Sequence, residues 1–499
     1  MPEILKTPGV YIVEKDAGAN AVVQVATAVP IFIGFTERAE INGKSFHMKP
    51  VHINSLSEFE VFFGIAPVPV FTVKPGDKGR GDININGQSY NLQQSANSSF
   101  YLYNSLRLFF DNGGADCFII SVGQYGKDSR NPIELTPDTF KKAIDILPGE
   151  EVPTMILMPD SLLLDEEDSS YYAAQTYALQ HCGKYMDKVA LFDIWGSAEE
   201  LPIEEDKNKY VTRFRENIGL DSLSYGAAYY PWVKTNIISL NDIGYENFNL
   251  DSLDAVIIEA HKPILTNLKN ATTEKEKKYW DSGLKSASKE YKLLRKTVAD
   301  RLCVLPASPA MAGLYTRTDR SRGVWIAPAN QNLNSVIAPS IKITHEDQET
   351  LNVDALSGKS INAIRAFKGR GSAIVWGART LAGNNVEWRY INVRRLFILI
   401  EQSIKNASFS VVFRPNVSVT WSVVKGTIGN FLTSLWRQGA LVGATPADAF
   451  TVKCGLGETM SEDDINEGIM RIQVKAAPSR PAEFIVITFE QKMGGTEGS

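Results

Sequence analysis

The sequence predicts a protein of several domains that combines α/β and α+β architecture, with a doubly wound α/β domain and a small β excursion in its middle. Its 499 residues exceed the size of one compact core and correspond to about three domains of ~150 residues each. Continuous apolar runs alternate with helical patterns through the middle of the chain, which is typical of a parallel sheet covered on both faces. Short β-favouring runs at both ends of the chain need a sheet formed elsewhere.

The composition argues against several classes of function. Apolar residues make up 44% and charged residues 22% of the chain, as in ordinary folded proteins. The net charge of −5 gives no reason to expect nucleic acid or an anionic membrane surface as a partner. The four cysteines lie far apart without a CxxC motif, and the five histidines form no ligand cluster. We therefore expect no catalytic site, no metal or cofactor, and no enzymatic activity.

The sequence shows no pattern of a segment that enters a membrane. No apolar run approaches the ~18 residues that a membrane-spanning helix needs. The N-terminus also lacks a basic region followed by an apolar region, so we expect no signal peptide.

Residues 1–20 are predicted to form an N-terminal arm. A Pro-Gly pair precedes a short β-favouring run, which Gly18 ends. The run consists of Val10, Tyr11, Ile12 and Val13. Because so short a strand cannot bury both of its faces alone, it needs another sheet.

The middle of the chain is predicted to be an α/β domain made of residues 21–65 and 99–345. Residues 66–98 are rich in Pro, Gly and Asn and are predicted to form a small surface β insertion. Predicted strands lie at residues 28–35, 117–122, 155–158, 189–195 and 225–230. Predicted helices lie at residues 102–110, 171–185 and 210–217, and another begins at residue 136.

A basic segment at residues 265–301 is predicted to be one amphipathic helix. Its apolar residues recur every three or four positions, while lysines and arginines occupy the other face. We interpret the basic face as solvated, in preference to a nucleic-acid site.

Two aspartates suggest an alternative function. Asp160 and Asp193 follow predicted strands, where α/β folds place ligands, and paired carboxylates there could hold Mg²⁺ in a metal-dependent hydrolase. No phosphate-binding glycine loop, GxGxxG motif or GxSxG elbow accompanies them. An aspartate after a strand is also a common helix cap, and we favour that interpretation.

The last part of the chain, residues 346–499, is predicted to form a separate C-terminal domain. A strand is predicted at residues 373–376, helices at 393–404 and 421–435, and a one-sided strand at 470–474. The chain then carries a run that is apolar on both faces, made of Phe484, Ile485, Val486, Ile487, Thr488 and Phe489. Such a run is an aggregation hazard unless it pairs with another sheet.

An ordered series of segments resembles the contractile tail sheath family. The series is TPGVYIVE at the N-terminus, LFFDNGGADCFIISV, YGAAYYPWV, LPASPAMAGLYTRTDRSRGVWIAPAN, GRGSAIVWGARTLAGNNVEWRYINVRRLFILIEQSI and the closing APSRPAEFIVITFEQ. No single segment is decisive, but the set in this order is specific. The resemblance spans nearly the whole chain.

The resemblance implies a fold and a function. It implies a discontinuous core domain, in which the N-terminal arm joins residues 346–499, with the α/β domain inserted and projecting outward. It implies that the chain is a structural subunit of a helical sheath, which surrounds an inner tube and contracts to drive it through a target envelope. Val10–Val13 and Phe484–Phe489 would then pair with sheets of neighbouring subunits.

The resemblance also implies partners and a location. Copies of the chain would stack as hexameric rings around the inner tube protein, between baseplate and terminal cap proteins. The particle would assemble in the bacterial cytoplasm and form part of a phage tail or of a released extracellular device. A sheath-like component of the baseplate or cap is an alternative within the same kind of particle.

Three arginines, Arg379, Arg394 and Arg395, lie in the family-like stretch WGART…NVRRL. They could bridge subunits through paired contacts with carboxylates. Salt bridges within the chain, or solvation on a helix face, are an equal alternative.

Overall fold

The computed structural model describes residues 22–484, except 78–80, 96–97, 128, 132, 168 and 203–204. These residues form two compact units, each described by itself. The larger unit contains Ala26–Ile398 together with residues 480–484, and the smaller contains residues 22–25 and Leu399–Ser479. The predicted strands Val10–Val13 and Ile485–Phe489 lie outside the described residues.

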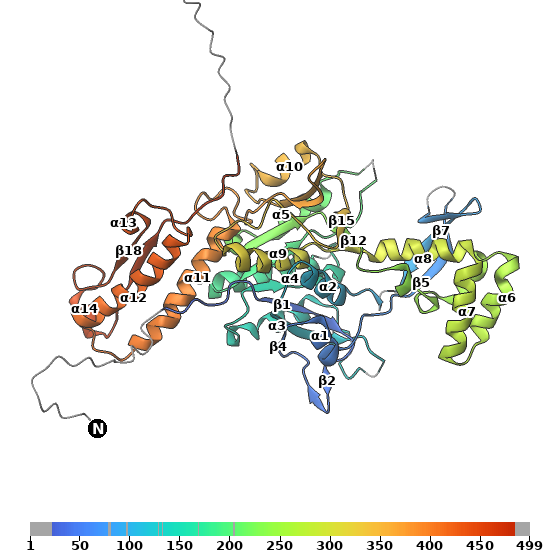
Figure 1. Cartoon of the computed structure of the whole chain (residues 1–499), viewed down its shortest axis with the longest axis horizontal. Helices are drawn as coiled ribbons and strands as arrows, with labels where there is room; N and C mark the ends of the chain where they lie inside the picture. Colours follow the sequence, from blue (N-terminus) through green and yellow to red (C-terminus); the bar gives the residue numbers. More distant parts are fainter. Residues whose placement is uncertain are drawn as a thin grey trace, which may run out of the picture. The chain divides into compact units, whose positions relative to one another are not determined.

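A large mixed sheet forms the centre of the larger unit (Figure 1). Its order is β14 (Gln331–Asn332), β17 (Gly371–Val375), β16 (Asn362–Phe367), β11 (Gly226–Tyr230), β10 (Val189–Asp193), β9 (Met155–Leu157), β1 (Pro30–Thr36), β8 (Cys117–Gln124) and β4 (Val51–Ile53). The strands from β8 to β16 run parallel. At one side of them β4 pairs antiparallel with β8, and at the other β17 pairs antiparallel with β16 and β14 antiparallel with β17. β1, β8 and β10 are buried along their whole length, which explains their continuous apolar sequences. The prediction of a mixed fold around a large sheet is confirmed.

Pairs of helices pack on this sheet. α2 (Leu102–Asp111) contacts α9 (Ser308–Arg322), and α3 (Pro137–Ile144) contacts α4 (Ser170–Tyr185). Both pairs also contact its strands. Other elements of this unit are α1 (Leu56–Phe63), α5 (Lys209–Asn217), α10 (His345–Asn352), β2 (Glu40–Ile41), β3 (Lys44–Ser45), β12 (Val233–Thr235), β13 (Val304–Leu305) and β15 (Val336–Pro339).

The β excursion at residues 66–98 is more than a surface insertion. Its strands β5 (Phe71–Pro75), β6 (Ile83–Ile85) and β7 (Gln88–Gln94) form a small sheet, which Figure 1 shows beside α8. The apolar residues that alternate along these strands share a second hydrophobic core with residues 243–299. The excursion and the segment 243–299 therefore stabilise one another.

The predicted single helix at residues 265–301 was wrong, because the segment folds as three helices. They are α6 (Lys262–Asn270), α7 (Glu274–Ala287) and α8 (Lys289–Leu302). Thr273 and Glu276 form a capping box that starts α7, and the Ser288 side chain accepts the Tyr291 N–H to start α8. These local caps interrupt an apolar stripe that is otherwise continuous.

The smaller unit contains helices packed near a short hairpin. α12 (Ser418–Arg437) contacts β18 (Phe450–Lys453), which pairs antiparallel with β19 (Gln473–Ala476). α13 (Pro446–Ala449) and α14 (Glu462–Asn466) complete the unit, and α11 (Ile391–Ser408) crosses the boundary between the units. Among the described residues, no helix is both long and apolar enough to cross a membrane.

The predicted domain boundary at residue 346 does not coincide with the boundary between these units. β16 pairs parallel with β11, so residues 362–375 extend the large sheet. Residues 480–484 also group with the larger unit. Strand pairing between distant segments sets this boundary, and the sequence pattern did not reveal it.

Candidate functional site

Asp160 lies just after β9 and is fully buried. Its Oδ2 accepts the backbone N–H of Phe35 at 2.7 Å, and its Oδ1 accepts those of Tyr101 at 2.6 Å and Leu102 at 3.2 Å. The last two N–H groups belong to the start of α2, so the carboxylate caps this helix and ties it to β1. A Cβ at Gly34 would lie 2.5 Å from Oδ2, so this strand position has no room for a side chain.

Asp193 plays the same part for another helix. It ends β10, and its Oδ1 accepts the backbone N–H groups of Ala307 at 2.6 Å and Ser308 at 2.9 Å, where α9 begins. The two aspartates thus satisfy different helix N-termini. Within the described ranges, no group of three or more His, Cys, Asp or Glu residues could hold a metal ion. The carboxylates are engaged structurally, as the helix-cap interpretation predicted.

Replacing Asp193 with alanine is expected to lower the free energy of unfolding by about 2–4 kcal/mol, because two buried N–H groups lose their acceptor. Asp193→Asn keeps an acceptor oxygen and is expected to cost about 1 kcal/mol. Denaturant unfolding of both variants measures the difference. Equal small losses would contradict the cap, and loss of a phosphatase activity in an Asp160→Asn, Asp193→Asn variant would support the hydrolase alternative.

Burial raises the pKa of Asp160 to about 6, although its backbone hydrogen bonds partly offset the rise. The folded state therefore binds the carboxyl proton more tightly than the unfolded state does. This proton binding stabilises the fold fully below pH 3.8, and the stabilisation is lost as the pH rises through about 6. From pH 4 to 7, the stability of Asp160→Asn relative to wild type should increase by about 2 kcal/mol. Paired denaturation curves at the two pH values test this, and a constant difference would contradict it.

Arg379 lies after β17 and binds the C-terminal segment. Its Nε lies 2.9 Å from Oε1 of Glu483, and its Nη2 lies 2.7 Å from Oε2. Glu483 also accepts hydrogen bonds from Asn352 Nδ2 and the Tyr390 hydroxyl, each at 3.0 Å. Burial raises the pKa of Glu483, but these donors together lower it by more, so the pKa lies below its usual value. Residues 480–484 are thereby attached to the larger unit.

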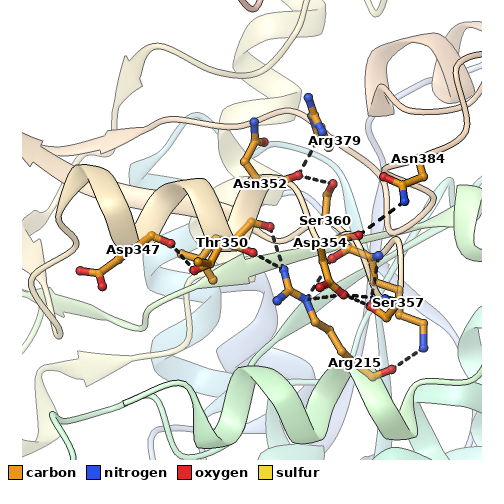
Figure 2. Close-up of polar contacts among 11 residues, drawn as sticks. Arg215, Asp347, Thr350, Asn352, Asp354, Ser357, Ser360, Arg379 and Asn384 are labelled. Carbon is orange, nitrogen blue, oxygen red and sulfur yellow. Dashed lines mark hydrogen bonds and ion pairs between the residues drawn. The ribbon is translucent and has the colours of Figure 1, made fainter. Parts of the chain in front are cut away.

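The contacts of Arg379 continue into the turn that follows α10, which Figure 2 shows. Its Nη1 donates to the carbonyl of Asn352 at 3.0 Å, and Ser360 Oγ donates to the same carbonyl at 2.6 Å. Arg215 from α5 donates to the carbonyls of Thr350 at 2.7 Å and Lys359 at 3.0 Å. Charged side chains therefore hold both ends of this turn.

Arg395 forms a buried ion pair between two helices. Arg395 lies in α11 and Asp319 lies in α9. Nη1 of Arg395 is 3.1 Å from Oδ1 of Asp319, and Nη2 is 2.5 Å from Oδ2. The side chains are only 3% and 7% exposed. Nη2 also donates to the carbonyl of Thr27 at 2.8 Å, and the guanidinium lies 4.6 Å from the Tyr315 ring centre.

Arg394 is buried among aromatic residues. Its guanidinium carbon lies 3.4 Å from the ring centre of Trp388 and 4.3 Å from that of Tyr225. Its Nη1 contacts the Tyr225 hydroxyl at 3.2 Å. Arg379 and Arg395 thus form ion pairs within the chain, whereas Arg394 packs against aromatic rings. A role between subunits stays a prediction.

The inter-subunit strands predicted from the sequence are described only at Phe484, whose side chain is 71% exposed. The sequence did not reveal Glu483 and Asp319, which pair with Arg379 and Arg395. It also did not reveal Arg215, which binds the turn after α10. These partners lie far from one another in the sequence, so no local spacing could have indicated them.

Comparisons with known proteins agree with the resemblance found in the sequence. Residues 384–492 match the family described as phage tail sheath C-terminal domain. The tail sheath protein of Vibrio phage KVP40 is 29% identical over 200 residues, which is 40% of this chain, and the chain spans 28% of that protein's length.

Two solved structures match nearly the whole chain. A chain of the sheath complex of the extracellular contractile injection system PVC, in its contracted state, is 27% identical, with a TM-score of 0.60. The match covers 98% of this chain and 99% of that one. A chain of the anti-feeding prophage (AFP) baseplate is 28% identical, with a TM-score of 0.58, and the match covers 98% and 100% of the two chains. The chain is therefore similar to contractile tail sheath proteins along nearly its whole length, and its C-terminal part matches the tail sheath family.

Proposed function

We propose that this chain is a structural subunit of a helical contractile sheath, which surrounds an inner tube and contracts to drive the tube through a target envelope. The observation that carries the proposal is the likeness, along nearly the full chain, to a chain of a contractile sheath complex. The structural engagement of Asp160 and Asp193 agrees with a subunit that performs no bond chemistry.

The proposed mechanism uses backbone pairing between subunits. Val10–Val13 and Phe484–Phe489 add strands to the sheets of neighbouring copies, so the subunits stay linked while their domains rotate as rigid bodies. The Arg379–Glu483 ion pair fixes the point where the C-terminal strand leaves its own subunit. The buried Arg395–Asp319 pair keeps the larger unit rigid during this rotation.

The partners of the chain follow from this function. Copies of the chain stack as hexameric rings, contact the inner tube protein along their length, and meet baseplate and terminal cap proteins at the ends. Assembly takes place in the bacterial cytoplasm, and the product is part of a phage tail or a released extracellular particle. Neither nucleic acid nor a cofactor takes part.

A sheath-like component of the baseplate is the second candidate, favoured by the likeness to a chain of the AFP baseplate. Negative-stain microscopy of the purified protein separates the two. A sheath subunit should form hollow ribbed tubes, whereas a baseplate component should form rings or short oligomers only. A monodisperse monomer under all conditions would contradict both.

A further inference from the structure

We propose that the turn at residues 353–358, here the knob loop, is a contact surface for a second copy of this chain, with Leu356 as its apolar anchor. This inference rests on the proposed sheath function and adds to it a side-chain contact outside the paired strands. Leu356 is 99% exposed and Val353 in the same loop is 52% exposed. A single exposed leucine is ordinary, so the argument depends on how the loop is held and where it lies.

The knob loop is fixed by polar contacts rather than by Leu356. The Asp354 carboxylate accepts the Ser357 N–H at 2.9 Å and contacts the Ser357 hydroxyl, and it lies 3.8 Å from Nε of Arg215. The Gly358 N–H donates to the Asp354 carbonyl at 3.0 Å, and Gly358 has a φ of 70°, which favours glycine. Figure 2 shows Asp354 and Ser357 beside Arg215.

The base of the knob loop contains a buried charge. Lys359 is only 2% exposed, and its ammonium group donates to the carbonyl of Arg215. Lysine is rarely buried so fully unless it is paired. The chain thus commits Arg215 and Lys359 to hold a loop whose most exposed residue makes little contact with its own subunit.

The position of the knob loop identifies its partner as a second copy. Asn352 directly precedes the loop and contacts Glu483 at 3.0 Å, so the loop begins beside the root of the C-terminal segment. Leu356 is four residues from Asn352, which places it within about 14 Å of that contact. The chain continues past Glu483 with the apolar run Phe484–Phe489, which lends a strand to a neighbour in the proposed function. A neighbour that receives this strand close to Glu483 would meet the knob loop, which is why we assign a second copy as its partner.

A matched pair of variants tests the contact. Leu356→Ser and Leu220→Ser each remove a leucine side chain that is mostly exposed, 99% and 79% respectively, so both variants should fold and melt like wild type. Leu356→Ser should need an about tenfold higher protein concentration to form tubes, because each contact loses a buried leucine. Leu220→Ser should form tubes at the wild-type concentration.

A labelling experiment reports the contact directly. The four native cysteines are buried, so a maleimide reagent should modify mainly the new thiol of Leu356→Cys. We expect rapid labelling of dispersed protein and protection in assembled tubes. Equal labelling in both states, or tubes of Leu356→Ser at the wild-type concentration, would overturn the contact while leaving the sheath function intact. Wild-type protein that never assembles would overturn the sheath function and the contact together.

Discussion

Deleting residues 1–15 should leave a folded subunit that forms no contractile sleeve. The deletion removes Val10–Val13, the run that is proposed to pair with a neighbouring sheet, and leaves the described residues of both units intact. Backbone pairing supplies a series of hydrogen bonds at once, so its loss should abolish assembly rather than weaken it. Negative-stain microscopy shows whether tubes form, and a thermal melt checks that the subunit is folded.

The outcome shows whether the arm is needed for assembly, for folding or for neither. A shortened chain that melts like wild type and forms no tubes supports strand exchange by the N-terminal arm. Normal tubes that still contract would show that the arm is dispensable. A shortened chain that melts at a much lower temperature would contradict the claim that the arm serves assembly rather than folding.

The buried strands were the part of the fold that the sequence predicted best. Apolar runs at residues 28–35, 117–122, 155–158 and 189–195 correspond to β1, β8, β9 and β10, with ends that differ by a few residues. A strand covered on both faces must be apolar throughout, so its apolar run can be recognised in the sequence without knowing which elements surround it. The predicted helix at 171–185 coincides with α4 for a related reason, because its buried face repeats at helical spacing.

Contacts between distant residues were the part that the sequence could not predict. Asp319 and Arg395 are 76 positions apart, and Glu483 and Arg379 are 104 apart. Neither local propensity nor periodicity encodes such pairs, since they depend on which elements the fold brings together. The helix caps at Asp160 and Asp193 are intermediate, because a cap was the favoured interpretation but the helices they cap lie elsewhere in the chain.

Replacing Asp319 with alanine is expected to lower the free energy of unfolding by about 3–5 kcal/mol. The substitution leaves Arg395 buried in the larger unit without its carboxylate partner, although the Thr27 carbonyl still accepts one hydrogen bond. A buried guanidinium cannot escape by deprotonation, because arginine keeps its proton in proteins. Denaturant unfolding followed by tryptophan fluorescence gives the loss.

Two controls identify burial as the cause of this loss. Glu259→Ala breaks the exposed pair with Lys262, whose side chains are 85% and 38% exposed, and should cost less than about 1 kcal/mol. The double variant Asp319→Leu, Arg395→Met replaces both buried charges with apolar groups and should recover much of the stability that Asp319→Ala loses. If Asp319→Ala cost no more than Glu259→Ala, the Arg395–Asp319 pair would not stabilise the larger unit. The rigidity that the proposed contraction requires would then have to come from the apolar core of this unit alone.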